Sequence, residues 1–105
     1  MGHFFELFAD MDDIAHEFNI NHSELEGVRI LIAFYSYEDY NGTAWVLFER
    51  DGKLYEVHGG HCSCYGLEGQ WDPEETSTDY LRNQLEKGRW YVSDDALDAL
   101  RLIVA

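Results

Sequence analysis

The segment VRILIAFYSY, residues 28–37, constrains the fold of this chain more than any other stretch. It is rich in β-branched and aromatic residues, which are the residues that strands favour. Apolar side chains fall on both of its alternating faces. This pattern is typical of a central strand that is covered on both faces, or by a helix on one face and a partner on the other.

Two further strand patterns follow this segment. Asn41-Gly42 predicts a turn, Thr43 to Arg50 (TAWVLFER) a second strand, and Asp51-Gly52 a tight hairpin turn. Leu54 to His58 (LYEVH) is the third strand pattern. Strands joined by such short turns form an antiparallel meander, which needs a helix on at least one face to be stable.

Helical patterns flank the three strands. Apolar residues recur at helical spacing from Phe4 to Phe18 and predict an N-terminal amphipathic helix. Asp72-Pro73-Glu74-Glu75 has the chemistry of a helix start, and Ser93 is placed to cap a last helix, DDALDALRLIVA. The sequence therefore predicts one α+β domain over residues 1–105: a three-stranded antiparallel meander packed with an N-terminal helix and two C-terminal helices.

Acidic side chains dominate the charge of the chain. There are 21 Asp and Glu against 7 Lys and Arg, which gives a net charge of −14. This charge excludes direct binding of nucleic acid through a basic surface, whereas it attracts basic protein surfaces. It also keeps a small, aromatic-rich protein in solution, and that explanation is sufficient for much of the surface.

Four carboxylates form a line along the predicted N-terminal helix, roughly opposite its apolar face: Glu6, Asp10, Asp13 and Glu17. No Lys or Arg stands four residues after Asp13 or Glu17, and like charges at this spacing cost a few tenths of a kcal/mol per pair. We interpret the line as a candidate surface for a basic partner. Its spacing loosely imitates the phosphates of a nucleic acid strand.

Aromatic residues are more numerous than one small core can hide. Tyr37 and Trp45 lie in the predicted strands and are candidate exposed anchors for a partner, because Tyr and Trp are favoured at interfaces. A three-stranded sheet with two apolar faces also suits a homodimer that is formed through the uncovered face.

The stretch HGGHCSCYGLEGQW, residues 58–71, places possible zinc ligands close together: His58, His61, Cys62 and Cys64. Their spacing differs from that of zinc knuckles, which pair C-x₂₋₄-C with a second ligand pair farther along the chain. A structural turn shaped by the glycines, with buried thiols and Trp71 as a lid, is an alternative. A reactive thiol is a further alternative, although negative surroundings disfavour the thiolate.

The segment GGHCSCYGLEGQW, followed by DPEET, resembles part of a group of small, largely uncharacterised proteins encoded by bacteriophages and prophages. The resemblance covers Gly59 to Thr76. It implies a phage origin, and it brings no fold, activity or site residue with it.

Several broad classes of function are disfavoured by the sequence. No apolar run reaches the roughly 20 residues that span a bilayer, and the N-terminus lacks the basic start of a secretory signal, so we expect a cytoplasmic protein in a host cell and no membrane partner. No set of nucleophile, base and oxyanion donors can be assembled, so we expect no enzyme.

These patterns lead to a main hypothesis and an alternative. The main hypothesis is a small acidic phage-type protein that binds and inhibits a host protein or defence complex, whose basic nucleic-acid-binding groove meets a nucleic-acid-like carboxylate surface. The alternative is a zinc-binding module organised by the ligands in residues 58–64.

Overall fold

The structure is a computed structural model that describes residues 3–6, 8, 10–38, 41–62, 66–87 and 94–104. Its elements, in chain order, are β1 (His3–Glu6), α1 (Met11–Phe18), the 3₁₀ helix η1 (His22–Leu25), β2 (Arg29–Glu38), β3 (Asn41–Arg50), β4 (Lys53–Cys62), β5 (Glu74–Thr76), α2 (Thr78–Lys87) and α3 (Asp94–Val104).

In the described ranges, five strands form a single sheet in the order β1-β2-β3-β4-β5. β1 pairs with β2 in parallel, and the other neighbouring strands are antiparallel. The long strands β2, β3 and β4 form the predicted meander, and the α+β class is confirmed. The short strands β1 and β5, which the sequence patterns did not predict, extend the sheet at its two edges.

The two predicted hairpin turns have different outcomes. Asp51 and Gly52 join β3 to β4 with φ of 54° and 78°, as a two-residue turn with two positive φ angles requires. The turn predicted at Asn41-Gly42 is wrong, because both residues belong to β3 and pair with Cys62 and His61 of β4. Pairing with strands on both sides outweighs the local preference of Asn-Gly for a turn.

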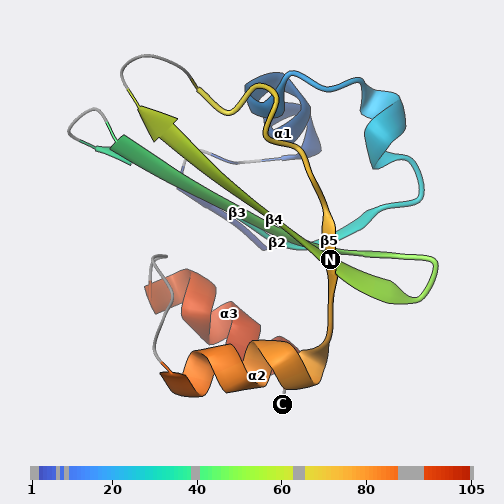
Figure 1. The fold of residues 1–105 in the computed structure, drawn as a ribbon, viewed down its shortest axis with the longest axis vertical. Coiled ribbons are helices and arrows are strands. Elements are labelled where there is room, and N and C mark those ends of the chain that lie inside the picture. Colours follow the sequence, from blue (N-terminus) through green and yellow to red (C-terminus); the bar gives the residue numbers. More distant parts are fainter. Residues whose placement is uncertain are drawn as a thin grey trace.

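The sheet lies between two helical layers, with α1 and η1 on one face and α2 and α3 on the other (Figure 1). Alternate residues of β3 reach the two layers: Val46 and Phe48 belong to the core on the α1 side, and Trp45 and Leu47 to the core on the α2–α3 side. The central strands are therefore buried on both faces by helices of the same chain. The homodimer predicted through an uncovered sheet face stays a prediction, and in the described part of the chain both faces of β3 are covered by helices.

The N-terminal part of the chain differs from the predicted helix. β1 (His3–Glu6) pairs with β2, and α1 begins only at Met11. Asp10 has extended backbone and caps this helix, accepting a hydrogen bond from the Asp13 N–H at 3.0 Å. Glu6 thus lies in a strand, so the predicted helical line of four carboxylates is wrong. Only Asp13 and Glu17 of that line belong to α1 itself.

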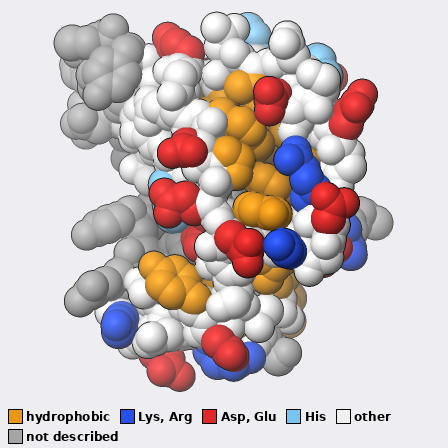
Figure 2. All heavy atoms as spheres, turned by 45° about the vertical axis from the view of Figure 1, so that its right-hand side comes forward, with side chains coloured by type: hydrophobic (Ala, Val, Ile, Leu, Met, Phe, Trp, Pro, Cys, Tyr) orange, Lys and Arg blue, Asp and Glu red, His pale blue; other side chains and the backbone are white. Residues whose placement is uncertain are grey.

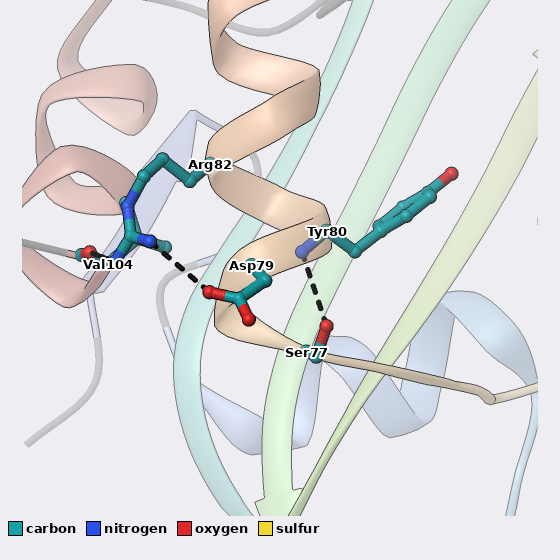
Figure 3. A network of polar contacts seen from close by, with 5 residues as sticks. All are labelled: Ser77, Asp79, Tyr80, Arg82 and Val104. Carbon is teal, nitrogen blue, oxygen red and sulfur yellow. Dashed lines mark hydrogen bonds and ion pairs between the residues drawn. The ribbon is translucent and has the colours of Figure 1, made fainter.

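The C-terminal helices agree with the prediction except at the first helix start. Asp72-Pro73 does not begin a helix, because Glu74–Thr76 pairs with β4 as strand β5. α2 begins at Thr78, and Ser77 Oγ accepts a hydrogen bond from the Tyr80 N–H at 3.2 Å (Figure 3). The predicted cap of α3, Ser93, lies outside the described residues.

Candidate functional site

Neither predicted aromatic anchor is available as an exposed side chain in the described structure. Trp45 is only 1% exposed, beneath α2 and α3, and its Nε1–H donates to Glu56 Oε1 at 3.0 Å. Its assignment as an exposed anchor is therefore wrong, because the strand pattern did not show which face the helices cover. Tyr37 lies in β2, and its side chain is outside the described part of the chain.

The glycine-rich stretch begins as strand and not as a loop, since β4 continues to Cys62. Gly59 stands where the chain packs closely: a Cβ there would lie 3.0 Å from Leu67 Cδ2 and 3.3 Å from Phe18 Cε1, so these side chains would have to shift. Gly59 therefore allows Leu67 to pack against the sheet, where it is fully buried.

Gln70 fastens the following loop to the edge of β4. Its Oε1 accepts from the Gly60 N–H at 2.8 Å, and its Nε2 donates to the carbonyl oxygens of Gly60 and Gly66, both at 2.7 Å. Trp71 then packs against Phe18 and stacks on Phe48. These contacts support the structural interpretation of this stretch, except for its thiols, whose side chains lie outside the described part.

The zinc hypothesis stays a prediction. Of its four ligands, His58 is the one whose side chain is described, and its Nε2 lies 3.2 Å from Glu56 Oε1. The side chains of His61, Cys62 and Cys64 lie outside the described part of the chain. Among the described residues, no group of three or more His, Cys, Asp or Glu side chains is placed to hold a metal ion.

A cavity of about 600 Å³ opens between the edge of the sheet and the start of α2. We call it the acidic hollow, and its lining residues are Glu56, His58, Glu74, Glu75, Thr76, Ser77 and Tyr80. Two strands and one helix start supply them, because the pairing of β5 with β4 brings the two stretches together. Figure 2 shows this side of the molecule, where acidic side chains lie between two groups of hydrophobic side chains.

Glu56 is the buried acid of the acidic hollow. The residue is 6% exposed, and Oε1 takes both the Trp45 and the His58 hydrogen bonds. Burial raises the pKa of Glu56, but the hydrogen bond from His58, the neighbouring Thr76 hydroxyl, the hydrogen bond from Trp45 and the charge of His58 outweigh it, so the pKa lies below its usual value of 4.5. The carboxylate is therefore ionised at neutral pH.

The second oxygen of this carboxylate is the chemically open position. Among the described residues, neither the Trp45 nor the His58 hydrogen bond ends on Oε2. The hydroxyl of Thr76 lies close enough to lower the pKa of Glu56, yet its buried Oγ1 makes no well-formed hydrogen bond in the described part. Among the described residues, the hydrogen bonds from Trp45 and His58 both end on Oε1, so Oε2 is the oxygen left for a further donor.

The rim of the acidic hollow is acidic and exposed. Glu74 and Glu75 extend from β5, and Lys53 Nζ lies 3.8 Å from Glu75 Oε1, with both side chains 61% exposed. Tyr80 is 53% exposed, and its ring projects from α2 on the side opposite to Arg82 (Figure 3). A hollow with this charge and an aromatic ring at its rim has features that suit an organic cation.

A second pocket, of about 320 Å³, lies on the α1 side of the sheet. We call it the aromatic pocket, and it is lined by Glu24, Phe48, Arg50, Tyr55, Trp71 and Pro73. Its aromatic rings pack on one another. Phe48 stacks on Tyr55 with 5.4 Å between ring centroids, and on Trp71 with 5.8 Å between ring centroids. Arg50 Nη2 donates to the carbonyl oxygen of Glu24 at 2.7 Å.

Sequence reasoning missed the acidic hollow, although one signal for it was present. Glu56 is a single carboxylate inside the apolar strand pattern LYEVH, on the same face as Leu54 and His58. Glu74 and Glu75 were interpreted as a helix start, so their approach to β4 was not foreseen.

Comparisons with protein-family models, with curated protein sequences and with solved structures give no match. In the described ranges, no helix is both long and apolar enough to cross a membrane.

Proposed function

We propose that this chain is a binding protein that holds a basic surface of another protein, and that the acidic hollow is the centre of its binding surface. The observation that carries the proposal is the ionised carboxylate of Glu56 at the base of a cavity whose rim holds Glu74 and Glu75. An exposed Tyr80 beside these carboxylates adds an aromatic contact of the kind found at interfaces.

The overall charge supports the same proposal. Even if every Lys and Arg of the chain paired with a carboxylate, a net charge of −14 would remain. Such a field speeds the approach of a basic partner and makes association sensitive to salt. The phage origin, the inhibition of a host protein or defence complex, and the cytoplasmic location stay predictions that accompany this proposal.

The binding surface so proposed lies at the edge formed by β5 and α2, and not on α1. Asp10 has a sufficient structural role as the cap of α1. Asp13 lies in the first turn of that helix, where a negative charge also stabilises the helix dipole. The rim residues Glu74 and Glu75 belong to a strand of three residues and have no such role in a helix.

A direct test measures binding of the purified chain to a panel of small basic domains and to acidic domains of similar size. We expect binding to basic domains. The association rate should fall steeply as the salt concentration rises, because salt shortens the Debye length and screens the attraction. Equal binding to both kinds of domain, or binding that does not depend on salt, would show the proposal to be wrong.

Two matched charge reversals locate the surface. Glu74→Lys with Glu75→Lys changes the rim of the acidic hollow, and Asp13→Lys with Glu17→Lys makes the same change in charge on α1. We expect the first pair to weaken binding of a basic domain by about tenfold or more, because it places like charge opposite the partner. If the α1 pair of substitutions weakened binding of the basic domain more than the rim pair, the binding surface would lie on α1 and not at the acidic hollow.

A further inference from the structure

The carboxylate of Glu56 is prepared for one additional donor. Trp45 Nε1 and His58 Nε2 both approach Oε1, at 3.0 and 3.2 Å, and within the described residues neither bond uses Oε2. The residue is 6% exposed and lines the acidic hollow, so an incoming group reaches it from that cavity. Charge-assisted hydrogen bonds are the strongest that a buried carboxylate forms, so a cationic donor that reaches Oε2 is favoured over a neutral one.

Tyr80 lines the same hollow as Glu56 and can supply a flat wall to it. Its ring is 53% exposed, and its backbone N–H is fixed by Ser77 Oγ at the start of α2. A guanidinium group is planar, stacks on an aromatic ring and presents parallel N–H donors to a carboxylate. An ammonium group is a compact, strongly hydrated charge and makes less use of both features.

The size and the rim of the acidic hollow select the same class of ligand. About 600 Å³ exceeds the space that a metal ion needs, and the described part of the chain holds no cluster of three metal-ligating side chains there. The exposed Lys53 Nζ lies 3.8 Å from Glu75 Oε1, so this rim carboxylate already has a cation of the chain beside it. Glu74 and Glu75 can guide a second cation inward.

We infer that the acidic hollow receives the guanidinium group of an arginine side chain from the basic partner, with Glu56 Oε2 as its acceptor and the Tyr80 ring as its stacking surface. This inference rests on the proposed function and specifies which type of side chain on the partner the acidic hollow binds. His58 is a positioning residue, because it holds Oε1 and leaves Oε2 to the ligand.

The indole N–H of Trp45 provides the measurement, since it donates to the same carboxylate. The ¹⁵N-labelled chain is titrated with the peptide acetyl-Gly-Gly-Arg-Gly-Gly-amide, and with peptides that carry Lys or the uncharged isostere citrulline in place of Arg. Concentrations extend to about 10 mM, because a single charged contact supports millimolar affinity. Loss of the signal in the Trp45→Phe variant assigns the indole resonance.

We expect the Arg peptide to shift the Trp45 resonance along a saturating curve. Binding of the Lys peptide should be at least about fivefold weaker, because it lacks the planar fork, and citrulline should cause no shift. Equal affinity for Lys and Arg would overturn the preference for guanidinium. A response to citrulline as large as that to Arg would overturn the ionic contact with Glu56.

Variants connect the response to named residues. Tyr80→Ala should weaken binding of the Arg peptide by about fivefold, whereas Leu102→Ala, at the other large exposed hydrophobic side chain of the described residues, should leave it unchanged. Glu56→Gln should abolish binding, and Glu86→Gln on the exposed surface of α2 is its matched control. Should Glu56→Gln fold poorly, Tyr80→Ala alone decides, because that side chain is exposed.

The failure of this inference is separable from failure of the proposed function. If basic domains bind in a salt-sensitive way but the Arg peptide leaves the Trp45 resonance in place, the proposed function stands and the arginine assignment falls. If neither basic domains nor the Arg peptide bind, both fall.

Discussion

Tyr55 and Glu56 are successive residues of β4, yet they line two different pockets on opposite faces of the sheet. On the α1 side, the walls of the aromatic pocket stack on one another, and Arg50 is held by a backbone carbonyl oxygen. On the α2–α3 side, the acidic hollow holds a buried carboxylate whose hydrogen bonds from Trp45 and His58 both end on Oε1. The aromatic pocket is filled mainly by contacts within the chain, although the buried Arg50 Nε has no hydrogen-bond partner in the described part. The acidic hollow is instead lined by carboxylates, and it is the pocket for which we propose a ligand.

The largest expected difference between the two pockets concerns stability. Phe48 is 1% exposed and stacks on two other rings, so Phe48→Ala should lower the free energy of unfolding by about 3–5 kcal/mol. Tyr80 is 53% exposed, and Tyr80→Ala should change it by no more than about 0.5 kcal/mol. Urea unfolding of both variants measures the difference. Similar losses would mean that the acidic hollow is also part of the folded core.

The next prediction concerns two neighbouring glycines of β4. Gly59→Ala brings a Cβ within 3.0 Å of Leu67 and 3.3 Å of Phe18, so we expect a loss of about 1–3 kcal/mol in the free energy of unfolding. Gly60→Ala is the matched control, because the nearest atom to its Cβ is the Gly42 carbonyl oxygen at 4.0 Å. The control should leave stability unchanged or raise it by about 0.4–1 kcal/mol.

Thermal unfolding of the two glycine variants under one set of conditions gives the comparison. An equal loss at both positions would mean that Gly59 serves backbone conformation in the strand and not the packing of Leu67 beneath it. The structural interpretation of the glycine-rich stretch depends on this distinction.

The helix caps offer a smaller contrast between the two helical layers. Ser77 caps α2 beside the acidic hollow, and Asp10 caps α1 on the other side of the sheet. Ser77→Ala and Asp10→Ala should each cost about 1 kcal/mol of unfolding free energy. Only Ser77→Ala should also weaken binding of the Arg peptide, because Tyr80 loses its fixed position. If both variants changed peptide binding equally, the Ser77 cap would have no specific role in positioning Tyr80 for the peptide.

The parts of the fold that the sequence predicted are those determined by local pattern. The meander follows from runs of strand-forming residues, the hairpin from Asp51-Gly52, and α3 from the helical spacing of residues such as Ala96 and Leu100. These signals need only neighbours within one element. They were sufficient for the class and for the order of the long strands.

The short edge strands could not be predicted in the same way. His3–Glu6 and Glu74–Thr76 become strands because β2 and β4 offer them free edges, and that pairing joins distant parts of the chain. The acidic hollow depends on the second of these pairings, so its lining residues were not recognised as a group. The exposure predicted for Trp45 failed for a related reason, since no local signal showed that α2 and α3 cover its face of the sheet.

The smallest expected effect is the pH dependence of stability at Glu56, because burial and hydrogen bonding act on its pKa in opposite directions. The folded-state pKa lies below the unfolded value of 4.5, so ionised Glu56 stabilises the fold above pH 4.5. This stabilisation is lost as the pH falls below 4.5 and through the folded pKa. The wild type should therefore be more stable than Glu56→Gln by a margin that narrows on acidification.

Urea unfolding of the wild type, Glu56→Gln and the surface control Glu86→Gln at several pH values between 7 and 3 measures that margin. The control shows how much of the change reflects the general relief of repulsion in a chain with a net charge of −14. A margin that widens on acidification would mean that the folded state raises the pKa of Glu56. In that case its carboxyl group would be protonated more readily than in the unfolded chain. Burial would then outweigh the hydrogen bonds from His58 and Trp45, and the carboxylate would be a weaker acceptor for a cationic ligand.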